Sequence, residues 1–451
     1  MERLYKFILS ILSPSLKAWG VYLVSVVLNQ LGDSSVINGE ASFFERMTCW
    51  TNSSIFILYV FTALILIEVL LYFILKPIVL KIDPTPHFAE IMKKYSDPIL
   101  INGQLGGLSW GVDKTLYLPP CIVEGWKPQQ ILIEKYDSSD YSFNKLTTGE
   151  LSERELQYNA LCEEYINYLE KDNTKNIQRI GNDLRRYMIT RAKPNANRNN
   201  PGFVVDLKST YWDQTSFVWG KAKDDSDWKK QIIEDQLVHK VTPLPNSFCL
   251  HLIIETADQK VIVSEISKAK ANDYALSKAV SLGEQIEALD FVLPQDIKTE
   301  FVTAWVQRAV MEEFGLDAER YFQFFDPSSI RVLGFDFEGD IINYSLPTLI
   351  RMKVDCDTLH KFTENSFDLK EISDFKCIAP EEIPGICVNA KVYSEDESEG
   401  AQDNSTEWHP SSYLRLLLYY LHRNGWNKTC RDFIKAEKEK EKEKKKQTTY
   451  A

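Results

Sequence analysis

The sequence predicts a membrane protein with a two-helix transmembrane hairpin over residues 1–83, followed by a cytosolic α+β domain that has an extended N-terminal connector. Long apolar runs are confined to the first part of the chain. The charges that flank those runs differ in sign, and short β-like runs mix with amphipathic helices further along. Because 451 residues exceed the usual size of one hydrophobic core, more than one folded unit is expected.

The second apolar run is the clearer of the two predicted spans. Residues Ile55–Leu75 contain a single charged side chain, Glu68. At a rise of ~1.5 Å per residue, such a helix covers a hydrocarbon core of about 30 Å. This pattern predicts a transmembrane helix over about 55–80.

The first apolar run predicts another span over about 7–31, although Pro14 and Lys17 interrupt it. The alternative is a secretory signal peptide, because the run is N-terminal and follows two basic residues. No convincing cleavage site follows Leu31, and a second apolar run comes soon after it. A first span with a lysine that reaches the interface is therefore favoured.

The charges around the two runs predict the orientation. The intervening loop, 32–54, holds three acidic residues and one basic residue, whereas four lysines follow the second run (Lys76, Lys81, Lys93 and Lys94). Because positive charge favours the cytoplasmic side, both termini are expected there, with the lipid bilayer of a bacterial inner membrane as the location.

Polar side chains within the predicted spans allow two interpretations. Glu68 lies mid-span, where an ionisable group is costly. Tyr22, Ser25 and Asn29 form a polar stripe on the first run. These four residues either hold helices together by hydrogen bonds or line a pore that forms on assembly.

The net charge restricts the class of binding partner, and the cysteine spacing indicates the redox state of the thiols. A formal charge of -12 argues against polymeric nucleic acid, whose phosphates need a basic surface, but leaves room for a small phosphorylated ligand. The 8 cysteines are scattered, without a CxxC pair or a zinc-ligand spacing. This pattern predicts reduced thiols and no disulfide framework.

Periodicity divides the remaining chain into a connector, a domain and a tail. The connector, 84–200, is mixed α/β with helical patterns at 150–170 and 176–191; the domain is 201–430; the charged tail is 431–451. Within the domain the patterns predict strands, a hairpin and helices. The strands are at 203–207, 215–219, 330–337 and 346–354, the hairpin at 247–256 and 260–267, and the helices at 227–239, 295–314 and 408–424.

The candidate ligand-binding residues lie on the predicted helix that ends at Phe314. Glu312 and Glu313 lie three and four residues after position 309, so all three positions share one helix face. Arg308 can pair with Glu312 one turn later.

This stretch resembles the Nudix box, G-x5-E-x7-R-E-U-x-E-E-x-G-U, in which U is a bulky aliphatic residue. Seven of its nine defined positions match: Glu300, Arg308, Val310, Glu312, Glu313, Gly315 and Leu316. Pro294 replaces the first glycine and Ala309 replaces a glutamate. The resemblance implies that this glutamate, with the two at 312 and 313 on the same helix face, would hold Mg²⁺ against a pyrophosphate. The resemblance implies a Nudix-like α+β domain with Mg²⁺ as its expected ion, held by Glu312 and Glu313, and the missing carboxylate argues against an enzyme.

Two spans followed by a degenerate Nudix-like domain are similar to the membrane effectors of bacterial cyclic-oligonucleotide anti-phage signalling systems (CBASS). That resemblance implies a cyclic oligonucleotide second messenger as ligand, assembly into a homo-oligomer, and inner-membrane disruption that kills the infected cell. It places ligand contacts at Arg308, Glu312 and Glu313, with Tyr211 and Trp212 as stacking candidates.

Two other functions remain open from the sequence. A membrane-anchored, Mg²⁺-dependent Nudix hydrolase would cleave nucleoside diphosphate derivatives, with Glu312 and Glu313 as metal ligands. A structural membrane adaptor would instead use the Nudix-like domain to bind protein.

Overall fold

The computed structural model describes the part of the chain that lies beyond residue 108. The chain divides between His87 and Phe88, and all described residues belong to the second unit. They are 109–110, 116–119, 121–171, 185–195, 202–225, 227–229, 231, 243–266, 277–287, 301–338, 342–366, 372–389, 391–392 and 407–450. The statements below concern these residues.

The predicted membrane hairpin finds no support in the structure. None of the helices in the described ranges combines the length and the hydropathy that a membrane span requires. The predicted fold class is therefore corrected to mixed β-sheets packed with helices. The predicted two-span location in a bacterial inner membrane is not supported. The segments 7–31 and 55–80 lie outside the described residues, as do Tyr22, Ser25, Asn29 and Glu68. The prediction rests on hydropathy alone.

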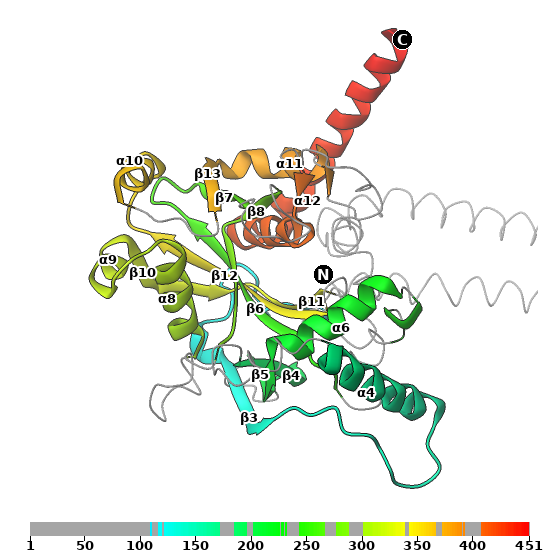
Figure 1. Ribbon diagram of the computed structural model, residues 1–451. Coiled ribbons are helices and arrows are strands. Elements are labelled where there is room, and N and C mark those ends of the chain that lie inside the picture. The colour runs from blue at the N-terminus through cyan, green and yellow to red at the C-terminus, as the bar shows by residue number, and fades with distance from the viewer. Residues whose placement is uncertain are drawn as a thin grey trace, which may run out of the picture. The chain divides into compact units, whose positions relative to one another are not determined.

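A large mixed sheet forms the centre of the described structure (Figure 1). Its core is the parallel pair β6 (Ser247–Glu255) and β12 (Asn343–Met352), which stay in register from Asn343↔Ser247 to Arg351↔Glu255. The strand order is β1 (Ser109–Trp110), β2 (Leu116–Tyr117), β11 (Phe335–Glu338), β12, β6, β7 (Val261–Ile266), β8 (Lys278–Val280), β15 (Glu407–Trp408) and β14 (Lys391–Val392). Off this path, β10 (Phe325–Val332) pairs with β12, β9 (Leu282–Gln285) with β6, and β13 (Ile372–Ile378) with β7.

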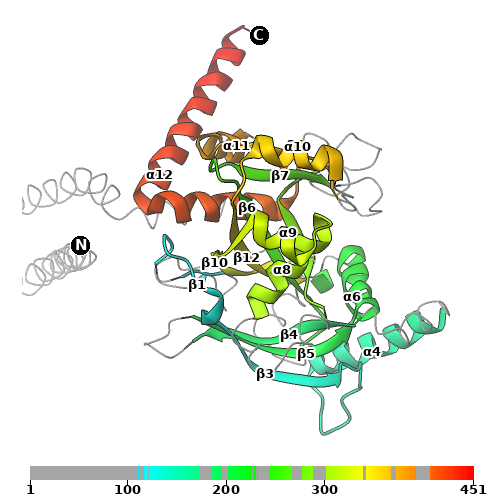
Figure 2. The same ribbon diagram turned by 90° about the vertical axis from the view of Figure 1, so that its left-hand side faces the viewer.

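Helices cover both faces of this sheet. Alternate residues of β6 point to opposite faces, so the strand contributes apolar side chains to two cores. Phe248 and Leu250 belong to the core that α8 (Phe301–Glu313) completes, whereas Ile253 belongs to the core of α12 (Pro410–Tyr450). Figures 1 and 2 show α8 and α12 on opposite sides of the central strands. The other helices are η3 (Pro128–Gln130), α4 (Glu153–Lys171), α6 (Trp212–Asp224), α9 (Ala318–Phe324), α10 (Cys356–Ser366), η8 (Pro380–Glu382) and α11 (Ile383–Asn389).

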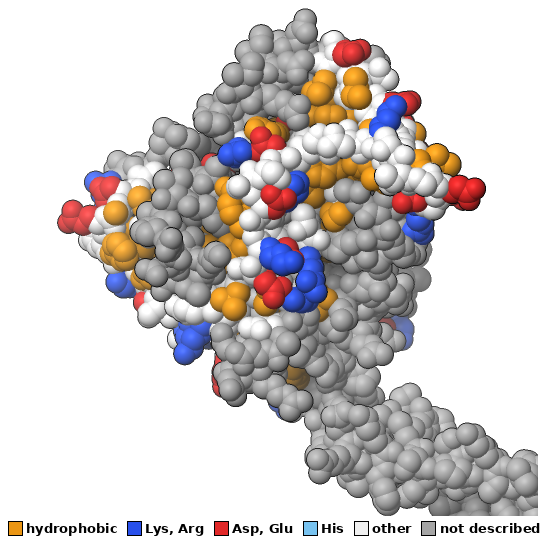
Figure 3. All heavy atoms as spheres, turned by 90° about the horizontal axis from the view of Figure 1, so that it is seen from below, with side chains coloured by type: hydrophobic (Ala, Val, Ile, Leu, Met, Phe, Trp, Pro, Cys, Tyr) orange, Lys and Arg blue, Asp and Glu red, His pale blue; other side chains and the backbone are white. Residues whose placement is uncertain are grey.

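A second sheet has three strands in the order β3 (Ile131–Asp140), β5 (Phe203–Tyr211) and β4 (Arg185–Pro194). These strands come from both sides of the boundary predicted at residue 200. Figure 3 views the molecule from this side, and among its described residues acidic and basic side chains lie intermixed, with apolar side chains between them. The domain boundary at residue 200 stays a prediction.

A buried asparagine joins the two sheets. Asn246, just before β6, accepts a hydrogen bond from the backbone N–H of Ile189 at 2.9 Å and donates one to its carbonyl at 3.0 Å. Its side chain thus replaces a strand partner for β4. An ion pair of 2.8 Å between Arg186 and Glu287 is a second connection, next to an isolated β-bridge between the same residues.

Several predicted elements are confirmed and two are wrong. The hairpin at 247–267 is β6 and β7, and the predicted helices at 295–314 and 408–424 correspond to α8 and the first part of α12. The predicted helix at 176–191 is wrong over its described end, where β4 begins at Arg185. The predicted strand at 215–219 is part of α6.

The cysteines also differ from expectation. Cys356 and Cys377 form a disulfide that joins the start of α10 to β13. Among the described residues the other cysteines are free thiols, namely Cys121, Cys162, Cys249, Cys387 and Cys430. The sequence spacing gave no sign of the pair, because 21 residues separate two cysteines that only the sheet brings together.

Candidate functional site: the Nudix-like helix and its carboxylates

The helix α8 buries its apolar face and leaves a charged edge. Phe301, Val302, Trp305, Val306, Ala309 and Val310 are fully buried. Their spacing of three and four residues places them on one face, which packs against β6; the ring centroids of Trp305 and Phe248 lie 5.1 Å apart. The position that would carry a metal-binding glutamate, Ala309, therefore lies inside the core.

Arg308 links the charged edge of α8 to β9 through a hydrogen bond and an ion pair. Its guanidinium donates to the carbonyl of Gln285 at 2.7 Å and to Glu312 at 2.7 Å, and it lies 3.5 Å from the carboxylate of Glu284. One cation thus bridges two carboxylates and a backbone oxygen. The predicted pairing of Arg308 with a glutamate one turn later is present in the structure.

The two glutamates of the motif differ in burial. Glu312 is exposed, whereas only 5% of Glu313 is accessible. The helix ends at Gly315, whose φ of 59° is the left-handed conformation that favours glycine. The N–H of Leu316 then donates to the Met311 carbonyl at 2.8 Å, which closes the last turn.

Glu284 has the most perturbed ionisation at this site. Burial raises its pKa to about 7, while the charge of Arg308 lowers it and the charges of Glu313 and Glu312 raise it. The loss of hydration is the larger effect, and the neighbouring guanidinium offsets only part of it. Glu284 can therefore exchange a proton near neutral pH, either donating or accepting a hydrogen bond.

The described residues do not fit a three-carboxylate Mg²⁺ site. Ala309 offers no ligand atom, and an oxygen of Glu312 already accepts from Arg308. In the described part of the chain, the one group of three side chains with potential ligand atoms within 4.8 Å of one another is not the glutamates but Cys356, His360 and Cys377, and its two cysteines are joined in the disulfide. No catalytic step through a metal follows from this arrangement.

The stacking candidates Tyr211 and Trp212 lie where β5 passes into α6. The Tyr211 hydroxyl donates to Asp140 at 2.9 Å. Trp212 packs edge-on against Trp219, with centroids 5.0 Å apart. Tyr211 thus has a hydrogen-bonding partner in the small sheet and Trp212 a packing partner within α6, and their role as ligand contacts stays a prediction.

Tyr211 is nevertheless connected to the helix site through neighbouring strands. It pairs with Arg185 in the β4–β5 ladder, and the next residue, Arg186, forms the ion pair with Glu287. Glu287 follows Gln285 by two residues, and the Gln285 carbonyl accepts from Arg308. The small sheet therefore approaches the same end of β9 that Arg308 contacts.

The sequence-based prediction assigned no role to Glu284, Arg186 or Glu287. They come from β9, β4 and the end of β9, so their proximity to the helix is a product of the tertiary fold. The motif positions Pro294 and Glu300 lie outside the described residues. A local motif could find the helix but not the strands that complete its site.

Comparisons with known proteins find only distant structural similarity. No family model matches the sequence, and no curated protein matches it either. A protein of Deinococcus radiodurans, DR0079, is 12% identical, with a TM-score of 0.21, over 31% of this chain and 70% of its own. A bifunctional NMN adenylyltransferase/ADP ribose pyrophosphatase from Francisella tularensis is 13% identical, with a TM-score of 0.21, over 47% of this chain and 52% of its own. At these TM-scores neither similarity carries an argument about fold or function.

Proposed function

We propose that this protein binds a cyclic oligonucleotide signal beside α8 without cleaving it. The observation that carries the proposal is the complete burial of Ala309, while Arg308 pairs with the carboxylates of Glu284 and Glu312. A hydrolase needs those carboxylates gathered on a metal ion. A receptor needs its ligand to survive binding, and the loss of a metal ligand serves that purpose.

The charges at the site favour contact with a nucleobase. Glu284, Glu287, Glu312 and Glu313 lie around two cations, Arg308 and Arg186. An excess of carboxylate repels phosphate but accepts hydrogen bonds from the N–H groups of a base edge. Glu284, with its pKa near 7, could also donate to a ring nitrogen when protonated.

Signal binding is proposed to favour a homo-oligomer. A ligand shifts such an equilibrium only by the difference between its affinities for the two states. The oligomer must therefore bind the cyclic oligonucleotide more tightly than the monomer does.

A Mg²⁺-dependent hydrolase of nucleoside diphosphate derivatives is the second candidate. One observation favours it: the charges of Glu312 and Glu313 raise the pKa of Glu284, so three carboxylates interact beside α8. The pairing of Arg308 with Glu312 weighs against it, because that carboxylate is already engaged.

The test is thermal unfolding of the full chain with cyclic di- and trinucleotides and with linear diphosphates, each with Mg²⁺ and each re-assayed afterwards. Saturation at ~100 times Kd adds about 2.7 kcal/mol of apparent stability. The proposal requires that a cyclic ligand stabilises the protein and is recovered intact. Glu312→Gln should weaken that stabilisation, and the exposed Glu319→Gln is its control. Consumption of a linear diphosphate without cyclic binding would establish the hydrolase instead.

A further inference from the structure

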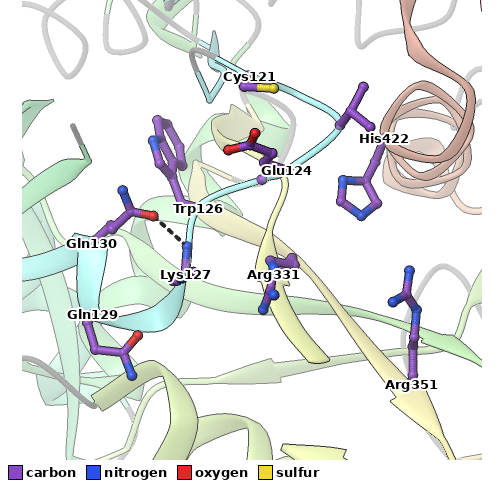
Figure 4. Close-up of a pocket in the computed structure, with 11 residues that line it drawn as sticks. Cys121, Glu124, Trp126, Lys127, Gln129, Gln130, Arg331, Arg351 and His422 are labelled. Atoms are coloured by element: carbon purple, nitrogen blue, oxygen red, sulfur yellow. Dashed lines mark hydrogen bonds between the residues drawn. The ribbon is translucent and has the colours of Figure 1, made fainter. Parts of the chain in front are cut away.

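A cavity of about 730 Å³ opens on the described surface (Figure 4), and the carboxylates beside α8 are not among its lining residues. It lies between the segment 121–130, the strands β10 and β12, and the helix α12. Its volume is within the ~300–1,000 Å³ typical of small-molecule sites. The segment 128–130 forms η3, which also packs against α8, so the cavity and the Nudix-like helix share a wall element.

The lining of the cavity is cationic, although the whole chain carries a net charge of -12. Lys127, Arg331 and Arg351 contribute positive charge, and Glu124 is the one carboxylate among the lining residues. The three cations come from three separate elements. Figure 4 shows them, with His422, around the same open space.

Each arginine is held by contacts that leave donors for a ligand. The guanidinium of Arg351 donates to Glu255 at 2.9 Å through Nε, and about half of the Arg351 side chain stays exposed. Glu255 itself is buried and also accepts from the Tyr419 hydroxyl at 2.6 Å. Arg331 donates through one nitrogen to the carbonyls of Ser328 and Ile330. Such contacts orient a guanidinium before any ligand arrives.

His422 adds a neutral acceptor to the cavity wall. Its Nδ1 lies 2.8 Å from the Ile122 carbonyl, which can only accept, so Nδ1 carries the hydrogen. Burial lowers the pKa of His422, and the charges of Arg351 and Arg331 lower it further, although the bond to Ile122 raises it. The free Nε2 of the neutral ring accepts from a hydroxyl or N–H group.

We propose that this cavity binds the phosphate groups of the nucleotide, with Lys127, Arg331 and Arg351 as their partners. This deepens the proposed function and rests on it: the carboxylates beside α8 contact a base, and the cationic cavity binds the phosphodiester. Three cations from separate elements match the several oxygens of a phosphate, and guanidinium groups pair with them in a fixed geometry. The neutral acceptor at His422 suits a ribose hydroxyl.

Inorganic pyrophosphate is the first probe, titrated into the full chain by calorimetry at low and high salt. Lys127→Glu reverses an exposed charge on the cavity wall, and Arg331→Gln removes the charge but keeps an N–H donor. Each substitution should weaken pyrophosphate binding at least about tenfold, whereas Lys438→Glu, the same reversal on the exposed end of α12, should leave it unchanged. Urea midpoints of all three variants check that they fold.

The same variants are then titrated with the cyclic oligonucleotide that stabilises the wild type. If pyrophosphate does not bind, or if Lys127→Glu and Arg331→Gln bind both probes like the wild type, the cavity is not the phosphate site, although the proposed function can stand. If pyrophosphate binds in the cavity but no cyclic oligonucleotide binds anywhere, the cavity remains a phosphate site and the proposed function fails.

Discussion

At the scale of single residues, the ionisation of Glu284 makes the site sensitive to pH. Burial raises its pKa from 4.5 to about 7, so between these values the folded protein holds a proton that the unfolded chain has lost. Stability contributed by that proton is complete below pH 4.5 and is lost as the pH rises through 7. The difference corresponds to about 3 kcal/mol.

We predict that Glu284→Gln removes this loss. The amide keeps the shape of the carboxyl group but cannot ionise, so the variant should gain stability relative to the wild type as the pH rises from 5 to 8, by up to about 3 kcal/mol. Urea unfolding at one-unit pH intervals measures the gain. Glu319→Gln, on exposed α9, is the control. A constant difference between variant and wild type across this range would contradict the prediction.

Ala309 supports a second residue-scale prediction. Restoring the motif with Ala309→Glu places a carboxylate at a position that is 0% exposed, so we expect destabilisation by about 3 kcal/mol or more and no gain of hydrolysis. Ala304→Glu, at a half-buried position of the same helix, should cost less. Chemical unfolding and a Mg²⁺-dependent pyrophosphatase assay provide the measurements. A stable and active Ala309→Glu protein would show that only one ligand separates this site from a hydrolase.

At the scale of elements, the sequence predicts a helix or strand correctly where its apolar pattern agrees with how the element packs in the fold. The alternation in 247–256 and 260–267 predicts β6 and β7, because each strand packs one or both faces on apolar neighbours. The described part of 176–191 carries helix-forming arginines, yet from Arg185 it extends as β4 because β5 and Asn246 supply its hydrogen bonds. Tertiary partners override weak propensities there, and the same holds for α6, whose aromatic residues resemble those of a strand.

The disulfide between Cys356 and Cys377 supports an element-scale prediction. It closes a chain segment with a separation of 21 residues, and a cross-link of that length is expected to add about 3 kcal/mol. Dithiothreitol should therefore lower the free energy of unfolding of the wild type by about that amount. Cys356→Ser should start at the lower value and not respond, whereas Cys121→Ser, at an exposed free thiol, should behave as the wild type. Equal stability in reduced and oxidised wild type would contradict this.

At the scale of the whole molecule, the site draws on parts of the chain that no local motif connects. The box spacing predicts α8, the turn at Gly315 and the pair of Arg308 with Glu312. Glu284 and Arg186 join the same site only because β9 pairs with β6 and the small sheet packs beside it. The cationic cavity likewise depends on the tertiary fold, since Lys127 lies roughly 200 residues before Arg331 and Arg351 in the chain. Sequence patterns record local geometry, and these sites are made by topology.

The connection between the two sheets gives the last prediction. Asn246 is fully buried, and its side chain satisfies both backbone groups of Ile189 on β4. Asn246→Ala leaves a buried N–H and a buried carbonyl without partners, at a cost of about 3 kcal/mol. The loss should concentrate in the small sheet, so the amides of β4 and β5 should lose more protection from hydrogen exchange than those of β6 and β12. Asn159→Ala is the matched control, because the Asn159 side chain makes the same pair of bonds to Leu146 within the part of the chain that packs on the small sheet. It should destabilise the protein without separating the protection of β4 from that of β6. Uniform loss of protection across both sheets in Asn246→Ala would mean that their shared hydrophobic core, and not the asparagine, makes them one cooperative unit.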